Sequence, residues 1–235
     1  MAKPEVNPNK IVVFTGSGIS ASSGIPMFRF GIDALWANHR VEDVATIGAL
    51  KKNPEKVIQF FNERKADMKD ALPTKAHIAI AALEQKYEVV VITTNIDNLH
   101  EKAGSTNVIH VHGNAFNARS SVDDELIYNL GDDPIVIGSL CEHGEQLRPD
   151  VVLFGEDVHL KSKAQSELKT AAKVIIIGSS LTVKPICNIF KAARGRAEKL
   201  IVAPDRLKAP FGFKHFHATA DEIVPKVVER WLRPQ

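Results

Sequence analysis

The sequence predicts an α/β fold, in which a doubly wound parallel sheet carries a small, partly helical subdomain inserted beside it. Six short apolar runs rich in Val and Ile recur along the 235 residues without polar alternation. Such runs are typical of strands that are buried on both faces of a parallel sheet. Helical patterns separate several of the runs, and this alternation of strands and helices indicates a layered α/β architecture.

The composition is that of a globular protein whose partners are neither nucleic acids nor membranes. Apolar residues make up 44 % of the chain, which suffices for a large core. Lys and Arg number 30 against 28 Asp and Glu, so the formal charge of +2 creates no strong field. The two cysteines, Cys141 and Cys187, fit a reducing compartment, and residues 1–10 lack the apolar core of a signal peptide. We therefore expect a cytoplasmic protein, with its oligomeric state left open.

The sequence predicts individual helices and strands as well. Helices are predicted over 75–86 and 162–172, and the helical spacing in "ADEIVPKVVERWLRP" predicts a closing helix that buries Trp231. The predicted strands are residues 11–14, 89–92, 108–111, 151–154, 174–177 and 200–203.

Two stretches do not follow this alternation of strands and helices. Residues 30–74 are charged and helical with no good strand, and residues 115–149 have the composition of a loop. We interpret both as insertions that form one small subdomain. The predicted large domain then comprises residues 1–29, 75–114 and 150–235.

A glycine turn follows the first strand. The run Gly16-Ser17-Gly18-Ile19-Ser20-Ala21 fits the G-x-G-x-x-[GA] fingerprint of a Rossmann-like, dinucleotide-binding sheet, in which glycines let the backbone approach a pyrophosphate. The motif alone is equally compatible with a packing role. A nicotinamide dehydrogenase would also need a second strand that ends in Asp or Glu about 20 residues later. No strand precedes Glu42 and Asp43, so this class is disfavoured.

Three more polar clusters lie at the ends of predicted strands, where open α/β sheets bind ligands. They are "TTNIDNLHEKAG", "HVHGNAF" and "GSSLTVKP". Asn95 and Asp97 can hydrogen-bond ribose hydroxyls or a carboxamide, and Ser179 and Ser180 can hold phosphate. Together with the glycine turn, these clusters indicate a dinucleotide site.

The chain resembles the sirtuin (Sir2) family of NAD-dependent protein deacylases from Lys10 to about Ala203. The resemblance lies in five segments that occur in the family's order: "GSGISASSGIPMFR", "TTNIDNLHEKAG", "HVHG", "LRPDVVLFGE" and "GSSLTVKP". Two further stretches, "ALWANHRVEDVAT" and "FFNERK", are similar to the bacterial and mitochondrial branch that removes acidic acyl groups.

The resemblance implies a set of contacts to NAD as a consumed co-substrate. Phe28 would shield the nicotinamide-side carbon, and Asn95 would grip the nicotinamide ribose as one of two catalytic residues. Residues 151–156 would offer an edge to which a substrate peptide adds as a strand. The residues implied for NAD are Gly16, Ser17, Gly18, Ile19, Phe28, Arg29, Thr94, Asn95, Ile96, Asp97, Gly178, Ser179, Ser180 and Ala203. Those implied for the acyl-lysine substrate are Phe61, Arg64, Val151, Val152, Phe154, Gly155 and Glu156.

His112 is the second implied catalytic residue, as general base. Cleavage of the nicotinamide–ribose bond leaves an electron-poor carbon that the amide oxygen of an acyl-lysine can capture. A neutral imidazole then accepts a proton from a ribose hydroxyl, which attacks the intermediate. The products are nicotinamide, free lysine and O-acyl-ADP-ribose. His110 lies on the same strand face, and we rank it second, as a packing or supporting group.

Several positions depart from the family pattern. The family's structural zinc needs two C-x-x-C pairs, whereas this chain has only Cys141, with His143 nearby and Ser120 and Ser121 where the first pair would be. One thiol and one imidazole do not close a tetrahedral site. We therefore expect no bound zinc, and a loop held by its own packing around residues such as Leu126, Tyr128 and Leu130.

Other departures concern the two substrates. Thr94 replaces a usual glutamine and Ala203 a frequent asparagine, and each lost hydrogen bond would weaken NAD binding by roughly 1 kcal/mol. Phe61 stands where the acidic-acyl branch has tyrosine, while Arg64 keeps the positive charge. We expect acetyl-lysine to be a substrate, succinyl-lysine a weakened one, and longer apolar chains to be tolerated.

Two other classes remain open from the residues alone. One is an NAD-consuming hydrolase or ADP-ribosyltransferase that uses no acyl-lysine, and the other is a non-catalytic module that senses NAD. Release of nicotinamide without a peptide distinguishes the first, and ligand-induced stabilisation without turnover distinguishes the second.

Overall fold

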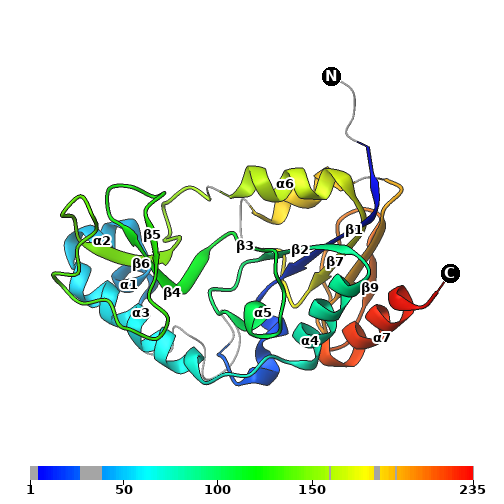
Figure 1. Ribbon diagram of the computed structural model, residues 1–235, viewed down its shortest axis with the longest axis horizontal. Coiled ribbons are helices and arrows are strands. Elements are labelled where there is room, and N and C mark those ends of the chain that lie inside the picture. The colour runs from blue at the N-terminus through cyan, green and yellow to red at the C-terminus, as the bar shows by residue number, and fades with distance from the viewer. Residues whose placement is uncertain (1–4, 27–38, 159, 183–185, 194, 235) are drawn as a thin grey trace.

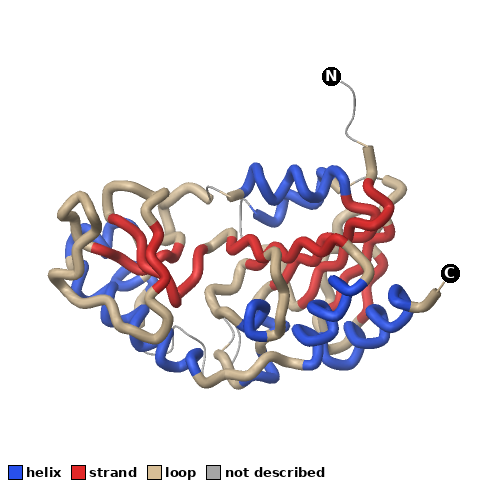
Figure 2. The backbone as a smooth tube through the Cα atoms, in the orientation of Figure 1, coloured by secondary structure: helices blue, strands red, loops and turns tan. Residues whose placement is uncertain are grey.

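The computed structural model describes residues 5–26, 39–158, 160–182, 186–193 and 195–234. It contains two sheets, which form a large and a small lobe (Figures 1 and 2). The large lobe has six parallel strands in the order β3-β2-β1-β7-β8-β9. They are β1 (Asn7–Thr15), β2 (Glu88–Thr93), β3 (Val108–His110), β7 (Ala171–Ile177), β8 (Glu198–Val202) and β9 (Lys214–Phe216).

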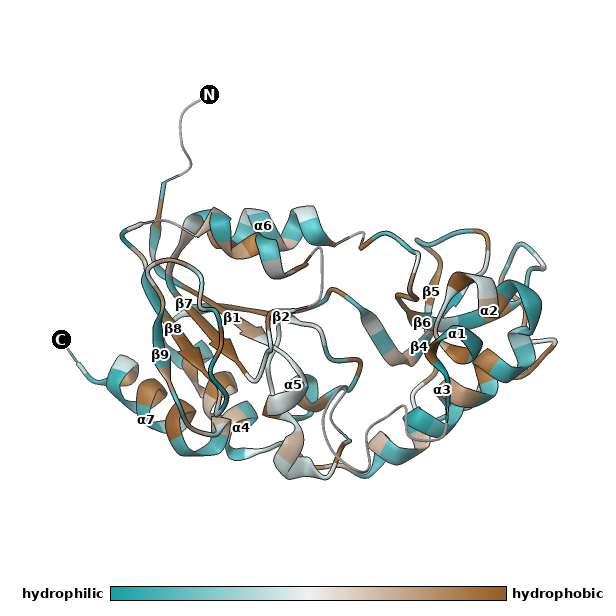
Figure 3. Cartoon of the chain, turned by 180° about the vertical axis from the view of Figure 1, so that it is seen from behind, coloured by the Kyte–Doolittle hydropathy of each residue, from teal (hydrophilic) through white to brown (hydrophobic). Residues whose placement is uncertain are grey.

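Helices cover both faces of this sheet, which explains the uninterrupted apolar runs. Figure 1 shows α6 (Lys161–Thr170) on one side, and α4 (Lys75–Ala82), α5 (Leu99–Lys102) and α7 (Ala220–Leu232) on the other. Side chains of β1 alternate between the two layers. Ile11 and Val13 pack with α4 and α7, including Trp231, whereas Val12 and Phe14 pack with α6 and a 3₁₀ segment over Ile186–Ala192. Figure 3 shows the apolar strands between these helices.

In its described residues, the small lobe combines three helices with an antiparallel sheet in the order β5-β4-β6. Asn53 caps the long helix α3 by accepting a hydrogen bond from the backbone N–H of Lys56, and Pro54 starts it. Its helices are α1 (Val41–Val44), α2 (Ile47–Lys52) and α3 (Pro54–Lys69), and its strands are β4 (Gly113–Ser120), β5 (Ile127–Asn129) and β6 (Leu147–Val151).

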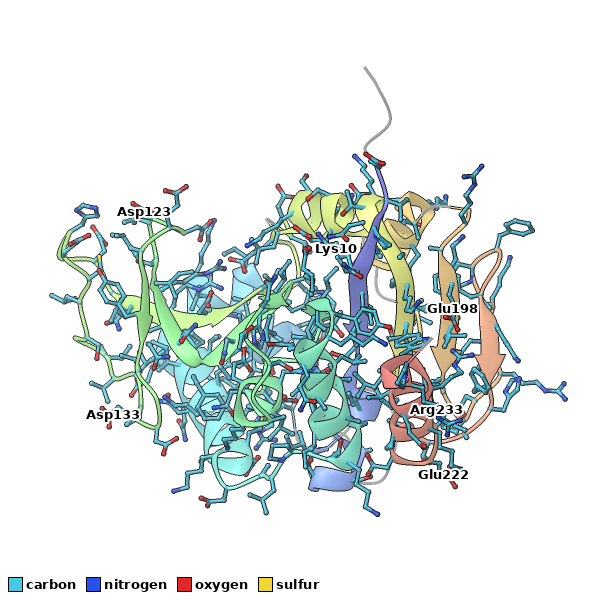
Figure 4. The ribbon with its side chains drawn as sticks, turned by 45° about the vertical axis from the view of Figure 1, so that its right-hand side comes forward. Lys10, Asp123, Asp133, Glu198, Glu222 and Arg233 are labelled. Carbon is cyan, nitrogen blue, oxygen red and sulfur yellow. The ribbon has the colours of Figure 1, made fainter. Side chains whose placement is uncertain are left out.

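Charged side chains mark the outer ends of the two lobes. In Figure 4, Asp123 and Asp133 lie on outer loops of the small lobe, far from Glu198 and Arg233 on the large one. Lys10 lies near the start of β1, where its Nζ is 3.0 Å from Glu88 Oε1 and 2.5 Å from Glu167 Oε2. These two ion pairs join β1, β2 and α6 at the end of the sheet opposite the glycine turn.

Two expectations about secondary structure are wrong, and one strand was not expected. Residues 115–149 contain most of an antiparallel sheet rather than a loop, and residues 151–154 form no strand of the parallel sheet, because β6 ends at Val151 in the small sheet. The sixth parallel strand is instead β9, whose three residues give too short a pattern to detect. The two lobes support the division of the chain into two domains, which we keep as a proposal.

Among the described residues, no helix is long and apolar enough to span a membrane.

The core of the small lobe includes residues from the region where the sequence analysis expected the family's zinc cysteines. Cys141 is buried with Ala118 and Leu147, and Tyr128 and Leu130 pack against them. Leu126, which was expected in the same cluster, is half-buried and lies outside it.

Two buried histidines make the large lobe sensitive to acid. His77 and His100 lie with ring centroids 4.6 Å apart, and His100 Nε2 is 3.0 Å from Thr15 Oγ1. Burial lowers the pKa of His77 to about 4 and that of His100 well below its usual range. Both rings are therefore neutral in the folded protein at pH 7.

We expect the free energy of unfolding to fall as the pH drops below 6.5. Between pH 6.5 and about 4 the unfolded chain binds a proton at His77 that the folded chain does not, which amounts to about 3 kcal/mol over the interval. Urea unfolding at pH 7 and pH 5 measures this. H77Q should show a smaller loss between these pH values than the wild type, and H143Q, at an exposed histidine, is the control. An equal loss in H77Q and the wild type would contradict the assignment.

Candidate active site

One cavity of about 1090 Å³ lies between the two lobes. The carboxyl ends of β1, β2, β7 and β8 form one side, and α3 with the segment after β6 forms the other. This position at the carboxyl ends of parallel strands is where the sequence predicted a ligand. The predicted residues that line it are Gly16, Ser17, Gly18, Phe61, Arg64, Thr94, Asn95, Ile96, Asp97, His112, Val151, Val152, Phe154, Gly155, Glu156, Gly178, Ser179, Ser180 and Ala203.

One predicted NAD residue is placed elsewhere. Ile19 is not part of the lining, because its side chain is buried in the core between the sheet and helices α4 and α7. Its backbone instead closes the glycine turn, since the N–H of Ile19 donates to Gly16 O. Phe28 and Arg29 lie outside the described residues.

The glycine turn is packed directly against the turn that follows β7. The N–H of Gly18 donates to Gly178 O at 2.9 Å, and a Cβ on Gly18 would lie 2.8 Å from Gly178 Cα. Gly178 itself has φ +60°, and a Cβ there would lie 2.4 Å from the nitrogen of Ile19. Only residues without a side chain permit this approach. The two turns therefore form a close-packed backbone floor suited to a pyrophosphate.

The chain after this turn does not continue as an α-helix. It makes two 3₁₀ turns, Ser17–Ile19 and Ala21–Ser23, and Gly24 then adopts φ +79°. A 3₁₀ turn is tighter than an α-helix and seldom extends far. The left-handed residue at Gly24 ends it, so Ile25 and Pro26 turn to line the cavity.

A buried polar chain fixes Asn95 beside the glycine turn. Its Nδ2 donates to Ser20 Oγ at 3.2 Å and lies 3.3 Å from Gly16 O, while Ser20 Oγ donates to Asp97 Oδ2 at 2.9 Å. Burial raises the pKa of Asp97, although hydrogen bonds from the Leu99 N–H and the Ser20 hydroxyl act in the opposite direction. This arrangement holds amide and carboxyl groups ready for ribose hydroxyls or a carboxamide.

Sequence reasoning gave Ser20 no role, although it joins Asn95 to Asp97. Its place within the quoted glycine motif was the available signal. The reasoning also missed the segment after β8, where Asp205, Arg206 and Lys208 are exposed at the cavity. That segment carried only the general signal that it follows a parallel strand.

His112 faces the cavity and is suited to accept a proton. It lies between β3 and β4, where the N–H of Val152 donates to its carbonyl oxygen at 3.0 Å. Burial lowers the pKa of its imidazole, and a hydrogen bond to the backbone of Thr94 offsets this only in part. The ring is therefore neutral at pH 7, as a general base must be.

His110, the alternative base, is engaged elsewhere. Its Nε2 lies 2.8 Å from Glu101 Oε1, and its Nδ1 lies 3.1 Å from the carbonyl oxygen of Asn95. Burial alone would lower the pKa of His110, but the hydrogen bond and charge of Glu101 raise it. His110 is not part of the cavity lining. These contacts suit it to support the Asn95 loop rather than to act on a ligand.

The segment after β6 offers less free backbone than the sequence suggested. The N–H of Phe154 donates to Ala45 O at 2.9 Å, and the N–H of Ile47 donates to Phe154 O. The Glu156 carboxylate pairs with the buried guanidinium groups of Arg119 and Arg148. The N–H groups of Val152 and Glu156 are likewise engaged, with His112 O and Leu153 O. A peptide that adds here as a strand would therefore have to use other backbone groups of the segment.

Ser120 and Cys141, which the sequence analysis compared with the family's zinc cysteines, are hydrogen-bonded to each other. Ser120 bonds to the thiol of Cys141 and lowers its pKa, with help from nearby backbone N–H groups. Within the described parts of the chain, no three His, Cys, Asp or Glu side chains are grouped to hold a metal ion.

Comparisons with known proteins agree with this geometry. The model of the "Sir2 family" matches residues 16–185. An NAD-dependent protein deacylase of Helicobacter pylori is 40 % identical over 225 residues, covering 93 % of this chain and 97 % of the relative. A mutant Sir2 homologue with ADP-ribose has a TM-score of 0.85 at 32 % identity, with 96 % of this chain and 95 % of that chain covered. A Sir2 variant with a deacetylated p53 peptide and 3'-O-acetyl ADP-ribose has a TM-score of 0.77 at 30 % identity, covering 94 % and 92 %.

Proposed function

Because this chain belongs to the Sir2 family and is an NAD-dependent protein deacylase, we propose that it removes acetyl groups from protein lysines and succinyl groups more weakly. The proposal rests chiefly on His112, a neutral imidazole that lines the same cavity as the glycine turn and helix α3. One end of this cavity suits a dinucleotide, and the other suits an acyl chain. We place the reaction in the cytoplasm, without a structural zinc.

The chain fits NAD as a co-substrate. The backbone floor formed by Gly16, Gly18 and Gly178 would carry the pyrophosphate, and a Cβ at any of these positions would force its two turns apart. Asn95 and Asp97 would hold the nicotinamide ribose and carboxamide, and the turn at Ser179 and Ser180 would face the adenosine half. The hydroxyl of Thr94 donates a hydrogen bond within the protein, to Thr15 O at 3.1 Å.

The chemistry follows from this placement. The nicotinamide–ribose bond breaks, and the acyl oxygen of the lysine amide bonds to the exposed sugar carbon. His112 then accepts the proton of a ribose hydroxyl, whose oxygen attacks the acyl carbon. The lysine leaves as a free amine, and a water molecule adds to the acyl carbon, so that the acyl group remains as an ester on the ribose hydroxyl oxygen and the sugar carbon keeps the former amide oxygen as a hydroxyl. Phe61 and Met68, both nearly fully buried on α3, would surround the acyl chain.

The experiment measures nicotinamide release from NAD with and without an acetyl-lysine peptide. We expect release to depend on the peptide and to match the lysine freed. Release at the same rate without peptide would instead assign an NAD hydrolase or transferase, and stabilisation by NAD without any release would assign a sensing module.

A further inference from the structure

Arg64 brings a positive charge to the part of the cavity that is lined by apolar side chains of α3. It lies on the same face of α3 as Phe61 and Met68, three and four residues away, and all three line the cavity. Its guanidinium carbon is 5.4 Å from the centroid of the Phe60 ring, and its Nε is buried without a hydrogen-bond partner. A guanidinium in such surroundings attracts a carboxylate strongly.

The carboxylate of Asp67 is already paired with the guanidinium of Arg64. Asp67 lies one helical turn after Arg64, and its Oδ2 is 3.1 Å from Arg64 Nη2. It also lines the cavity, with a side chain that is 48 % exposed against 22 % for Arg64. Among the described residues, Asp67 is the one carboxylate that pairs with Arg64.

The other charged groups of the lining do not alter this balance near α3. Glu156, after β6, is neutralised by Arg119 and Arg148, and Asp97 belongs to the polar chain with Ser20 and Asn95 beside the glycine turn. Asp205, Arg206 and Lys208 follow β8, at the end of the cavity formed by the large lobe. An acyl group next to α3 therefore meets a neutral ion pair rather than a free cation.

We propose that Asp67 is a specificity-determining residue that favours neutral acyl groups over acyl groups that end in a carboxylate. This inference rests on the proposed deacylase function and deepens it. A succinyl carboxylate can reach Arg64 only beside the like charge of Asp67, and such repulsion discriminates against a substrate without weakening a neutral one.

The test compares succinyl-lysine and acetyl-lysine forms of one peptide. In D67N, the ratio of kcat/KM for the succinyl peptide to that for the acetyl peptide should rise about tenfold or more, mainly through a lower KM for the succinyl peptide. E63Q removes a carboxylate from the same helix outside the cavity and should keep the wild-type ratio. The double variant R64Q/D67N should lose the rise, because the cation is gone.

An unchanged ratio in D67N, or an equal rise in R64Q/D67N, would overturn the proposal. Peptide binding measured by fluorescence anisotropy separates this outcome from failure of the proposed function. If the wild type turns over neither peptide, the deacylase assignment fails. The succinyl-to-acetyl affinity ratio in D67N then still decides the role of Asp67, since a rise supports it and an unchanged ratio refutes it.

Discussion

Replacing His112 by alanine is expected to lower the rate of deacetylation by about 10²- to 10⁴-fold, the usual contribution of a positioned general base. The loss should appear in kcat, because the imidazole acts after the substrates are bound. Exchange of labelled nicotinamide into NAD in the presence of the peptide should continue, since the base is not needed to break the nicotinamide–ribose bond. Both rates can be followed by chromatography of the same reaction.

H143A is the matched control, because His143 is exposed on the small lobe and does not line the cavity. It should behave as the wild type in both assays. Deacetylation by H112A within a few-fold of the wild type would show that another group serves as the base. Loss of both exchange and deacetylation would show that His112 is needed for binding or for the first step.

Replacing Gly178 by alanine should have the largest effect on stability and on NAD binding. The new Cβ would lie 2.4 Å from the nitrogen of Ile19 at a backbone φ of +60°, so the two turns must separate. We expect a loss of at least about 3 kcal/mol in unfolding free energy, as for other variants that create severe strain. NAD affinity should fall at least about tenfold, because the backbone floor is displaced.

Two variants distinguish the effect of the positive φ from the effect of the steric contact. Gly131 has a similar φ of +54° but open space around its Cβ, so G131A should cost only about 1 kcal/mol. Gly16 has an ordinary φ of −129°, yet a Cβ there would lie 2.8 Å from Gly178 O, so G16A isolates the contact. Urea unfolding and calorimetric titration with NAD measure both effects. Equal costs for G178A and G131A would refute the close approach of the two turns.

The parallel sheet could be predicted because a strand that is buried on both faces is apolar at every residue. Ile11 and Val13 pack against the helices on one face of the sheet, and Val12 and Phe14 pack on the other face. The whole run is therefore apolar. The polar residues that end these strands could likewise be assigned to one site, since parallel strands present their carboxyl ends at one edge.

The small sheet escaped prediction because its strands bury charge. Arg119 on β4 and Arg148 on β6 are only 4 % and 5 % exposed, and their pairing with Glu156 compensates them. A sequence shows the charged residues but not their partner, so the composition of these strands predicts a loop. The role of Asp67 was hidden for a similar reason, since an acidic residue on a charged helix most often faces solvent.

The products of the reaction test the central claim most directly. The chain should be incubated with NAD and an acetyl-lysine peptide, and the mixture resolved by mass spectrometry. The account predicts one O-acetyl-ADP-ribose for each nicotinamide and each free lysine formed. Free acetate with unmodified ADP-ribose as the first products, or ADP-ribose attached to the peptide, would contradict acyl transfer through the His112 site.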